Sequence, residues 1–239
     1  MVKFENVRFE GQVNVAENAE FVGCEFAAQG VDKKAKVFGV EVKNGAALTI
    51  KDSKFMNQGY SAVHMCSNGD VLLAGNHFNC VNVYNPIEGA VSEGSTKNIV
   101  VKDCEFEGAC GNNYFNLYRM EEGSQVELSG NKFIGCSANS EIIRISNPLN
   151  VAAHIKASNE EYGFANPENV NEYTSYIMCQ DYTAKSGNKQ DFTKIAVDME
   201  NVKCQGERIV SVPAVGVVSF TYEDGKGIIE GNDPVINIK

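Results

Sequence analysis

Four stretches of this chain share one pattern: LTIKDSKF at 48–55, VLLAGNHF at 71–78, IVVKDCEF at 99–106 and VELSGNKF at 126–133. Each begins with apolar residues, continues through a short polar turn and ends on Phe. The recurring Phe defines a predicted structural column, whose members are Phe9, Phe26, Phe55, Phe78, Phe106 and Phe133. A weaker copy ends at Tyr162. Repetition of short strands and turns with a period in the twenties is typical of a solenoid whose coils stack.

Within each repeat the apolar and polar residues alternate with the two-residue period of a strand. A further strand is expected after each Phe, for example AVHM at 62–65, YFNLY at 114–118 and EIIRIS at 141–146. Three short strands per turn, joined by Gly, Asn, Asp and Ser corners, predict an all-β fold, a parallel β-helix of about seven coils. Identical side chains in coils about 4.8 Å apart lie face to face, which explains the recurring Phe.

The repeat divides the chain into a parallel β-helix over residues 1–191 and a last coil with a small C-terminal β cap over residues 192–239. A hairpin is expected in the cap at EDGKG, residues 223–227. Insertions that we expect to emerge as loops, and to provide the contact surface, occupy residues 27–37, 85–97, 163–173 and 183–191. At the N-terminal end, either the charges of Lys3, Glu5, Arg8 and Glu10 blunt the first coil or another subunit lies on it.

Composition argues against several classes of partner. The 239 residues carry a net charge of −10 without a cluster of Lys and Arg, so we expect no nucleic-acid partner. No run of 18 apolar residues occurs, and the opening residues alternate like a strand rather than forming a secretory leader. We therefore expect a soluble protein, made in the cytoplasm without a signal peptide and without a membrane partner.

The eight cysteines are expected to be reduced thiols, because disulfides are uncommon in a chain of this size without a leader. Cys24 and Cys104 precede a repeat Phe by two residues, whereas Cys80 and Cys136 follow one. We expect these four to fill interior columns of small apolar side chains. The cysteines form no CxxC pair and the histidines are scattered, so no metal and no cofactor are predicted, and His64 is interpreted as a packing residue.

A candidate contact surface for a partner or glycan lies where loops meet the later coils. Its residues are Tyr114, Tyr118, Arg119, Arg144, Tyr173 and Tyr176. Aromatic faces can stack on a sugar ring or pack into a protein, and two Arg from adjacent coils can hold an anionic sugar. Under the alternative, the tyrosines close the sides of the coils and Glu121, Glu122 or Glu141 neutralises the Arg residues.

The coil pattern over about residues 1–180 resembles the right-handed parallel β-helix superfamily typified by pectin lyases. Many of its members cleave or bind polysaccharide, but this chain has only RIS at 144–146 where polygalacturonase-like members have RIK, and it has no Asp-Asp pair. Asp52 and Asp103, at matching turns, are expected to satisfy backbone donors. No catalytic residue is therefore assigned.

Small acidic β-helices of this kind also resemble components of tailed-phage particles. The function expected from that resemblance is a non-enzymatic structural protein of the virion, a head-decoration, fibre or tail component. Its rigid coil is the scaffold and its loops or ends are subunit interfaces, in a homo-oligomer with a trimer favoured or in a larger particle. The alternatives are a polysaccharide-binding or polysaccharide-degrading enzyme of the tailspike or lyase kind, and an exported cell-surface module.

Overall fold

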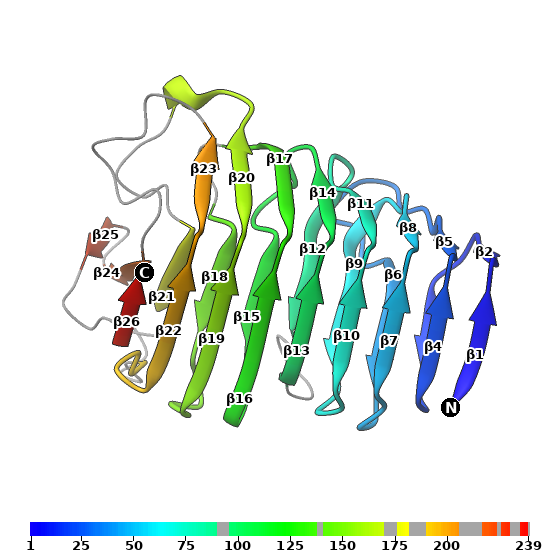
Figure 1. The fold of residues 1–239 in the computed structure, drawn as a ribbon, viewed down its shortest axis with the longest axis horizontal. Coiled ribbons are helices and arrows are strands. Elements are labelled where there is room, and N and C mark those ends of the chain that lie inside the picture. The colour runs from blue at the N-terminus through cyan, green and yellow to red at the C-terminus, as the bar shows by residue number, and fades with distance from the viewer. Residues whose placement is uncertain are drawn as a thin grey trace.

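The computed structural model describes residues 1–89, 96–137, 141–169, 176–181, 190–205, 217–223, 226–229 and 235–238. These residues form three sheets that run the length of the molecule, here called sheets A, B and C (Figure 1). The only helix in the described part is a single 3-10 turn, η1 (Pro167–Asn169).

Sheet A is parallel throughout and forms the front face in Figure 1. Its strands, in spatial order, are β1 (Val2–Glu5), β4 (Ala19–Val22), β7 (Leu48–Lys51), β10 (Val71–Ala74), β13 (Thr96–Lys102), β16 (Met120–Ser129), β19 (Ala153–Ser158), β22 (Ile195–Glu200) and β26 (Val235–Ile238).

Sheet B is made of the shortest strands and carries the repeat Phe residues. Its strands are β2 (Arg8–Phe9), β5 (Glu25–Phe26), β8 (Lys54–Phe55), β11 (His77–Asn79), β14 (Glu105–Glu107), β17 (Lys132–Cys136), β20 (Glu161–Phe164) and β23 (Lys203–Gln205).

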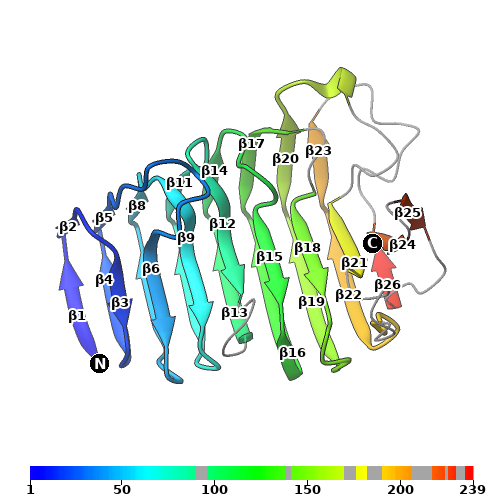
Figure 2. The ribbon, with the colours of Figure 1, turned by 180° about the vertical axis from the view of Figure 1, so that it is seen from behind.

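Sheet C faces the viewer in Figure 2. Its parallel strands are β3 (Val13–Val15), β6 (Phe38–Lys43), β9 (Gly59–Cys66), β12 (Val83–Gly89), β15 (Phe115–Tyr118), β18 (Ile143–Ser146), β21 (Ile177–Asp181) and β24 (Val217–Glu223). A last strand, β25 (Lys226–Ile229), pairs antiparallel with β24, and it forms the hairpin expected at residues 223–227.

The chain visits sheets A, B and C in turn, from the triplet β1, β2, β3 to the triplet β22, β23, β24, which makes eight coils. The fold is a right-handed parallel β-helix, as the repeat predicts. The eighth coil falls within the C-terminal segment in which the sequence analysis expected one.

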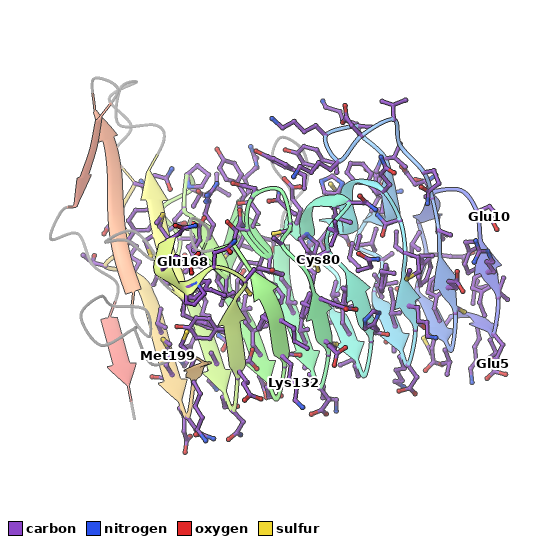
Figure 3. The ribbon with its side chains drawn as sticks, turned by 90° about the horizontal axis from the view of Figure 1, so that it is seen from above. Glu5, Glu10, Cys80, Lys132, Glu168 and Met199 are labelled. Carbon is purple, nitrogen blue, oxygen red and sulfur yellow. The ribbon has the colours of Figure 1, made fainter. Side chains whose placement is uncertain are left out.

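The Phe column is confirmed. Each repeat Phe pairs in register with the next along sheet B, and Phe133 pairs with Tyr162. From Phe26 to Phe133 the ring centroids lie 4.5 to 4.8 Å apart with nearly parallel planes. Rings at this separation fill the centre of the coil, and Phe55 and Phe106 are fully buried. Figure 3 shows side chains on successive coils, with Glu5 and Glu10 at the N-terminal end.

The turn from sheet A to sheet B is two residues long in every coil. Its first residue always has a positive φ, and these residues are Asn6, Gly23, Asp52, Gly75, Asp103, Gly130, Asn159 and Asn201. Where this first turn residue is Gly, the matching residue of the preceding coil is Asn or Asp. A Cβ on Gly75, for example, would lie 2.6 Å from Oδ1 of Asp52. Asp52 and Asp103 therefore occupy matching left-handed positions, as expected for turn residues.

The second residues of these turns form a column in which apolar and polar side chains are mixed. Its successive members are Val7, Cys24, Ser53, Asn76, Cys104, Asn131, Glu160 and Val202. The Cys24 backbone N–H donates to Ser53 Oγ at 2.9 Å, and that of Ser53 donates to Asn76 Oδ1 at 2.9 Å. Cys24, Cys80, Cys104 and Cys136 are all buried in the core, as expected. The column of Cys24 and Cys104 also contains polar side chains, because buried backbone donors at the turn need acceptors.

Two of the expected insertions lie at the corner between sheets B and C. Residues 27–37 join sheet B to sheet C, and so does the segment that contains η1. The insertion expected at 85–97 was placed too widely, because residues 85–89 belong to β12 and residues 96–97 to β13. The insertion expected at 183–191 falls, except for residues 190–191, outside the described residues.

Candidate functional site on the third sheet

A row of polar side chains runs along sheet C, one residue from each of the first six coils. The register places Asn14 beside Glu41, then His64, Glu88, Asn116 and Arg144 in turn. Two carboxylates of this sheet C row are well shielded, since Glu41 is 7% and Glu88 0% exposed, and His64 and Arg144 are half-buried. Shielded ionisable groups gathered on one face are typical of functional sites, so the sheet C row is the candidate site.

At the N-terminal part of this row, Glu41 forms a compact group with two residues of β9. Its Oε1 lies 3.3 Å from His64 Nδ1, and Cys66 Sγ lies 3.6 Å from the same nitrogen. The His64 ring stacks on Phe38 with a centroid distance of 4.3 Å. Burial lowers the pKa of His64, although the Glu41 carboxylate opposes this shift, so the imidazole is neutral at pH 7.

The next carboxylate along the row, Glu88, is enclosed by neutral donors. Ser61 Oγ donates to Oε2 at 2.9 Å, Asn85 Nδ2 donates to the same oxygen at 3.1 Å, and Asn116 Nδ2 donates to Oε1 at 3.3 Å. Burial raises the pKa of Glu88 above its ordinary value, and the three hydrogen bonds counteract only part of this effect. A carboxylate with no exposed surface cannot touch a ligand in this conformation.

Aromatic rings and the loop at residues 27–37 border the row. Tyr60 and Tyr84 lie in adjacent coils with ring centroids 5.2 Å apart, and Lys34 Nζ lies 5.7 Å from the centre of the Tyr84 ring. The loop is fixed by a backbone bond of 2.7 Å from Gly30 N–H to the Gln58 carbonyl. Figure 2 shows it crossing from the coil of β5 over the start of β9. The loop and the tyrosines therefore form one wall beside sheet C.

Two tyrosines of the predicted contact surface are in the core, and for them the prediction was wrong. Tyr114 is fully buried, packs edge-on against Phe106 and Phe133, and donates its hydroxyl to the Gly108 carbonyl at 2.7 Å. Tyr176 is also fully buried. Its hydroxyl donates to Glu160 Oε2 at 2.9 Å, so both hydroxyls are hydrogen-bonded inside the protein.

The remaining residues of the predicted surface are dispersed. Arg144 lies in β18 opposite Asn116 and forms an ion pair with Glu141, so it does not pair with Arg119 in the register expected for adjacent coils. Arg119 lies at the corner after β15 with a φ of 53°. Tyr118 is half-buried at the end of β15. Tyr173 lies outside the described residues.

The outer face of sheet B carries a second ordered feature, a row of alternating charge. The residues in register along it are Arg8, Glu25, Lys54, His77, Glu105, Lys132, Glu161 and Lys203. Acids and bases alternate on both sides of His77, which lies between Lys54 and Glu105 and interrupts the alternation. His77 Nε2 lies 3.1 Å from Glu107 Oε2 and 3.6 Å from Glu105 Oε1. Because these groups are exposed, we interpret this row as support for the coil register.

Sequence reasoning missed Glu41, Cys66 and Glu88 as site residues and assigned His64 only to packing. The alternation in FGVEVK at 38–43 and GYSAVHMC at 59–66 does place Glu41, His64 and Cys66 opposite the apolar face. Their proximity, however, depends on the register between β6 and β9. The packing role of His64 is confirmed by its stack on Phe38.

In the described part of the chain, no helix is both long and apolar enough to cross a bilayer. Comparison with known proteins found no matching family model, no matching curated protein and no matching solved structure.

Proposed function

We propose that this chain is a non-enzymatic structural protein that uses its rigid β-helix as a scaffold and its N-terminal end as a subunit interface. The assembly is a homo-oligomer, and its setting is the particle of a tailed phage. The resemblance to phage β-helix components supports the setting, and the structure of the first coil supports the interface.

The observation that carries the proposal is the open N-terminal coil. Within the described residues, β1, β2 and β3 each pair with a strand on one side alone, so their outer backbone groups face away from the stack. The apolar side chains at this end, Phe4, Val7, Phe9 and Val13, pack on the core but are only partly covered. Exposed strand edges above a partly covered core are the surface on which another strand adds.

Charges at this end do not oppose a second copy. Lys3 Nζ lies 2.6 Å from Glu5 Oε1, and Arg8 Nε lies 2.5 Å from Glu10 Oε1. The four charges that were expected to blunt the first coil therefore neutralise one another in pairs. Because these ion pairs are neutral, a second copy can cover this end of the solenoid at low electrostatic cost, even though the chain as a whole is acidic.

Light scattering coupled to size-exclusion chromatography tests the proposal. We expect the wild-type chain to be oligomeric. The measured mass distinguishes a trimer from a dimer, which is the assembly that an end-to-end contact between two chains produces. Val2→Lys places a charge on the open end and should yield monomers, whereas Val31→Lys changes a residue that is 93% exposed in the 27–37 loop and should not. A wild-type chain that stays monomeric at the highest accessible concentration would refute the end interface.

A polysaccharide-binding role is the second candidate, and the Tyr60–Tyr84 pair beside the sheet C row supports it. Two neighbouring aromatic rings can stack on successive sugars, and an array of acidic and neutral glycans would detect binding that Tyr84→Ala abolishes. Catalysis is less well supported than binding, since Glu88 and Glu141 are 0% and 2% exposed and cannot flank a glycosidic bond in this conformation. Turnover of any glycan by the wild-type chain would reverse that judgement.

A further inference from the structure

We propose that Glu41, His64 and Cys66 form a binding site for one divalent metal ion of the zinc type, with three protein ligands and a fourth position open to water. No metal site was expected from the sequence, because the histidines and cysteines are scattered along the chain. The β-helix brings one of each together with a carboxylate, and the proposal is independent of the scaffold function.

Strand geometry places the three side chains at the corners of a triangle. His64 and Cys66 are two residues apart on β9 and so project from the same face. Glu41 on β6 is the register partner of His64. Both strands lie inside a sheet with a paired neighbour on each side, so the three Cα positions are fixed by backbone hydrogen bonds.

The two distances from His64 Nδ1 to the other ligand atoms match those of a tetrahedral zinc site. With Zn–N and Zn–O bonds of about 2.1 Å and a Zn–S bond of about 2.3 Å, tetrahedral angles separate N from O by about 3.4 Å and N from S by about 3.6 Å. In the structure His64 Nδ1 lies 3.3 Å from Glu41 Oε1 and 3.6 Å from Cys66 Sγ. All three ligand atoms lie within 4.8 Å of one another.

Neighbouring residues orient two of the ligands. Gln12 Nε2 donates to Glu41 Oε2 at 3.1 Å, which leaves Oε1 directed toward the histidine. Phe38 stacks on one face of the His64 ring. Cys66 Sγ lies 3.6 Å from Nδ1 and 3.5 Å from Nε2, so the thiol lies directly beside the His64 ring. Supporting contacts of this kind are what make a metal site specific.

Lys43 competes with a cation at this site. Its Nζ lies 3.0 Å from Glu41 Oε2, and its side chain is 49% exposed, so it can move into water when an ion enters. Binding also releases the Cys66 thiol proton to the buffer, because the thiolate is the metal ligand. Metal affinity should increase when Lys43 is removed.

The donor set determines the class of ion. A thiolate, an imidazole and a carboxylate together favour Zn²⁺, Co²⁺ or Cu²⁺ over Mg²⁺ and Ca²⁺, which prefer oxygen ligands. The group of His77, Glu105 and Glu107 is equally compact but lacks sulfur, is more exposed and lies in the charge row of sheet B. It is therefore an internal control in the same chain.

Titration of the metal-free, full-length protein with Co²⁺ tests the proposal, because cobalt bound to a thiolate gives a charge-transfer absorption that other ligands do not. We expect one Co²⁺ per chain, displaced by Zn²⁺ and not by Mg²⁺. Cys66→Ser should remove the charge-transfer band, His64→Ala and Glu41→Gln should weaken binding at least tenfold, and Lys43→Ala should strengthen it.

The matched controls are Cys204→Ser, which removes the other half-buried thiol, and His77→Ala, which disrupts the oxygen-rich group. Both should leave the band and the affinity unchanged. Far-UV circular dichroism of each variant verifies that the β-helix is intact. A charge-transfer band that survives Cys66→Ser, or the absence of saturable Co²⁺ binding to the folded wild-type chain, would overturn the site.

Discussion

Replacing Glu160 by Gln should make this protein more stable at neutral and alkaline pH. Glu160 is 1% exposed at the turn between sheets A and B. Its Oε1 accepts hydrogen bonds of 3.0 Å from Asn131 N–H and Nδ2, and its Oε2 accepts one of 2.9 Å from the Tyr176 hydroxyl. All three donors are neutral. Burial raises the pKa of Glu160 from 4.5 to about 7, and the hydrogen bonds offset only part of that rise.

The sign follows from proton linkage. A carboxyl whose pKa is higher in the folded state stabilises the fold fully below pH 4.5 and loses that contribution as pH rises to about 7. The total loss is about 3 kcal/mol, from 2.5 pKa units at about 1.4 kcal/mol each. Between pH 5.5 and pH 8 the same arithmetic predicts a loss of about 2 kcal/mol. Glu160→Gln keeps the shape of the neutral acid and cannot ionise, so it should not show this loss.

Urea unfolding of both proteins at pH 5.5, 6.5, 7.5 and 8 measures the effect. The difference between the two free energies of unfolding should move by about 2 kcal/mol in favour of the variant across this range, because the other titrating groups cancel in the comparison. A difference that does not change with pH would show that Glu160 titrates normally. A difference that moves in the opposite direction would show that its ionised form is the one the fold stabilises.

Three further outcomes are expected. Gly75→Asn should cost about 1–3 kcal/mol by crowding Asp52 in the coil before it, and adding Asp52→Gly should restore part of that loss in a double-mutant cycle of urea unfolding. Thiol labelling of the native protein should modify only Cys66 and Cys204 among the eight cysteines. Labelling of Cys204 should be slow, because burial raises its pKa to about 11. Mass spectrometry measures the labelling, and modification of any of the six buried thiols would contradict the expectation. Lys132→Glu should destabilise the protein by up to about 1 kcal/mol at low salt and less at high salt, because it creates three adjacent acids in the charge row of sheet B; a salt-independent cost would contradict that reading.

The fold was predictable because one corner of the coil has constant length. Two residues separate sheet A from sheet B in every coil, so LTIKDSKF at 48–55 and its three homologous stretches align without gaps. The left-handed turn position also leaves a signal, since Asn, Asp and Gly are the residues that adopt it at low cost. Strand, turn and Phe together therefore specify the register of sheets A and B.

Sheet C was less predictable because its distance from sheet B varies. The connection spans residues 27–37 in one coil and residues 56–58 in the next, so the sequence alone does not align Glu41 with His64. The same variation hid the burial of Tyr114, which precedes β15 in an irregular connection. Both the sheet C row and the burial of Tyr114 depend on the register between neighbouring strands of sheet C. In this part of the coil, tertiary packing fixes that register.

The in-register Phe column is the central claim, and the free energy of unfolding of Phe106→Ala tests it most directly. Phe106 is fully buried, with rings 4.5 Å away on one side and 4.8 Å away on the other. Truncation should cost about 3–5 kcal/mol in urea unfolding. Phe38→Ala, on the outer face of sheet C, is the matched control and should cost less. A cost below about 1 kcal/mol for Phe106→Ala would contradict the account, because a ring that can be removed so easily does not lie inside the coil.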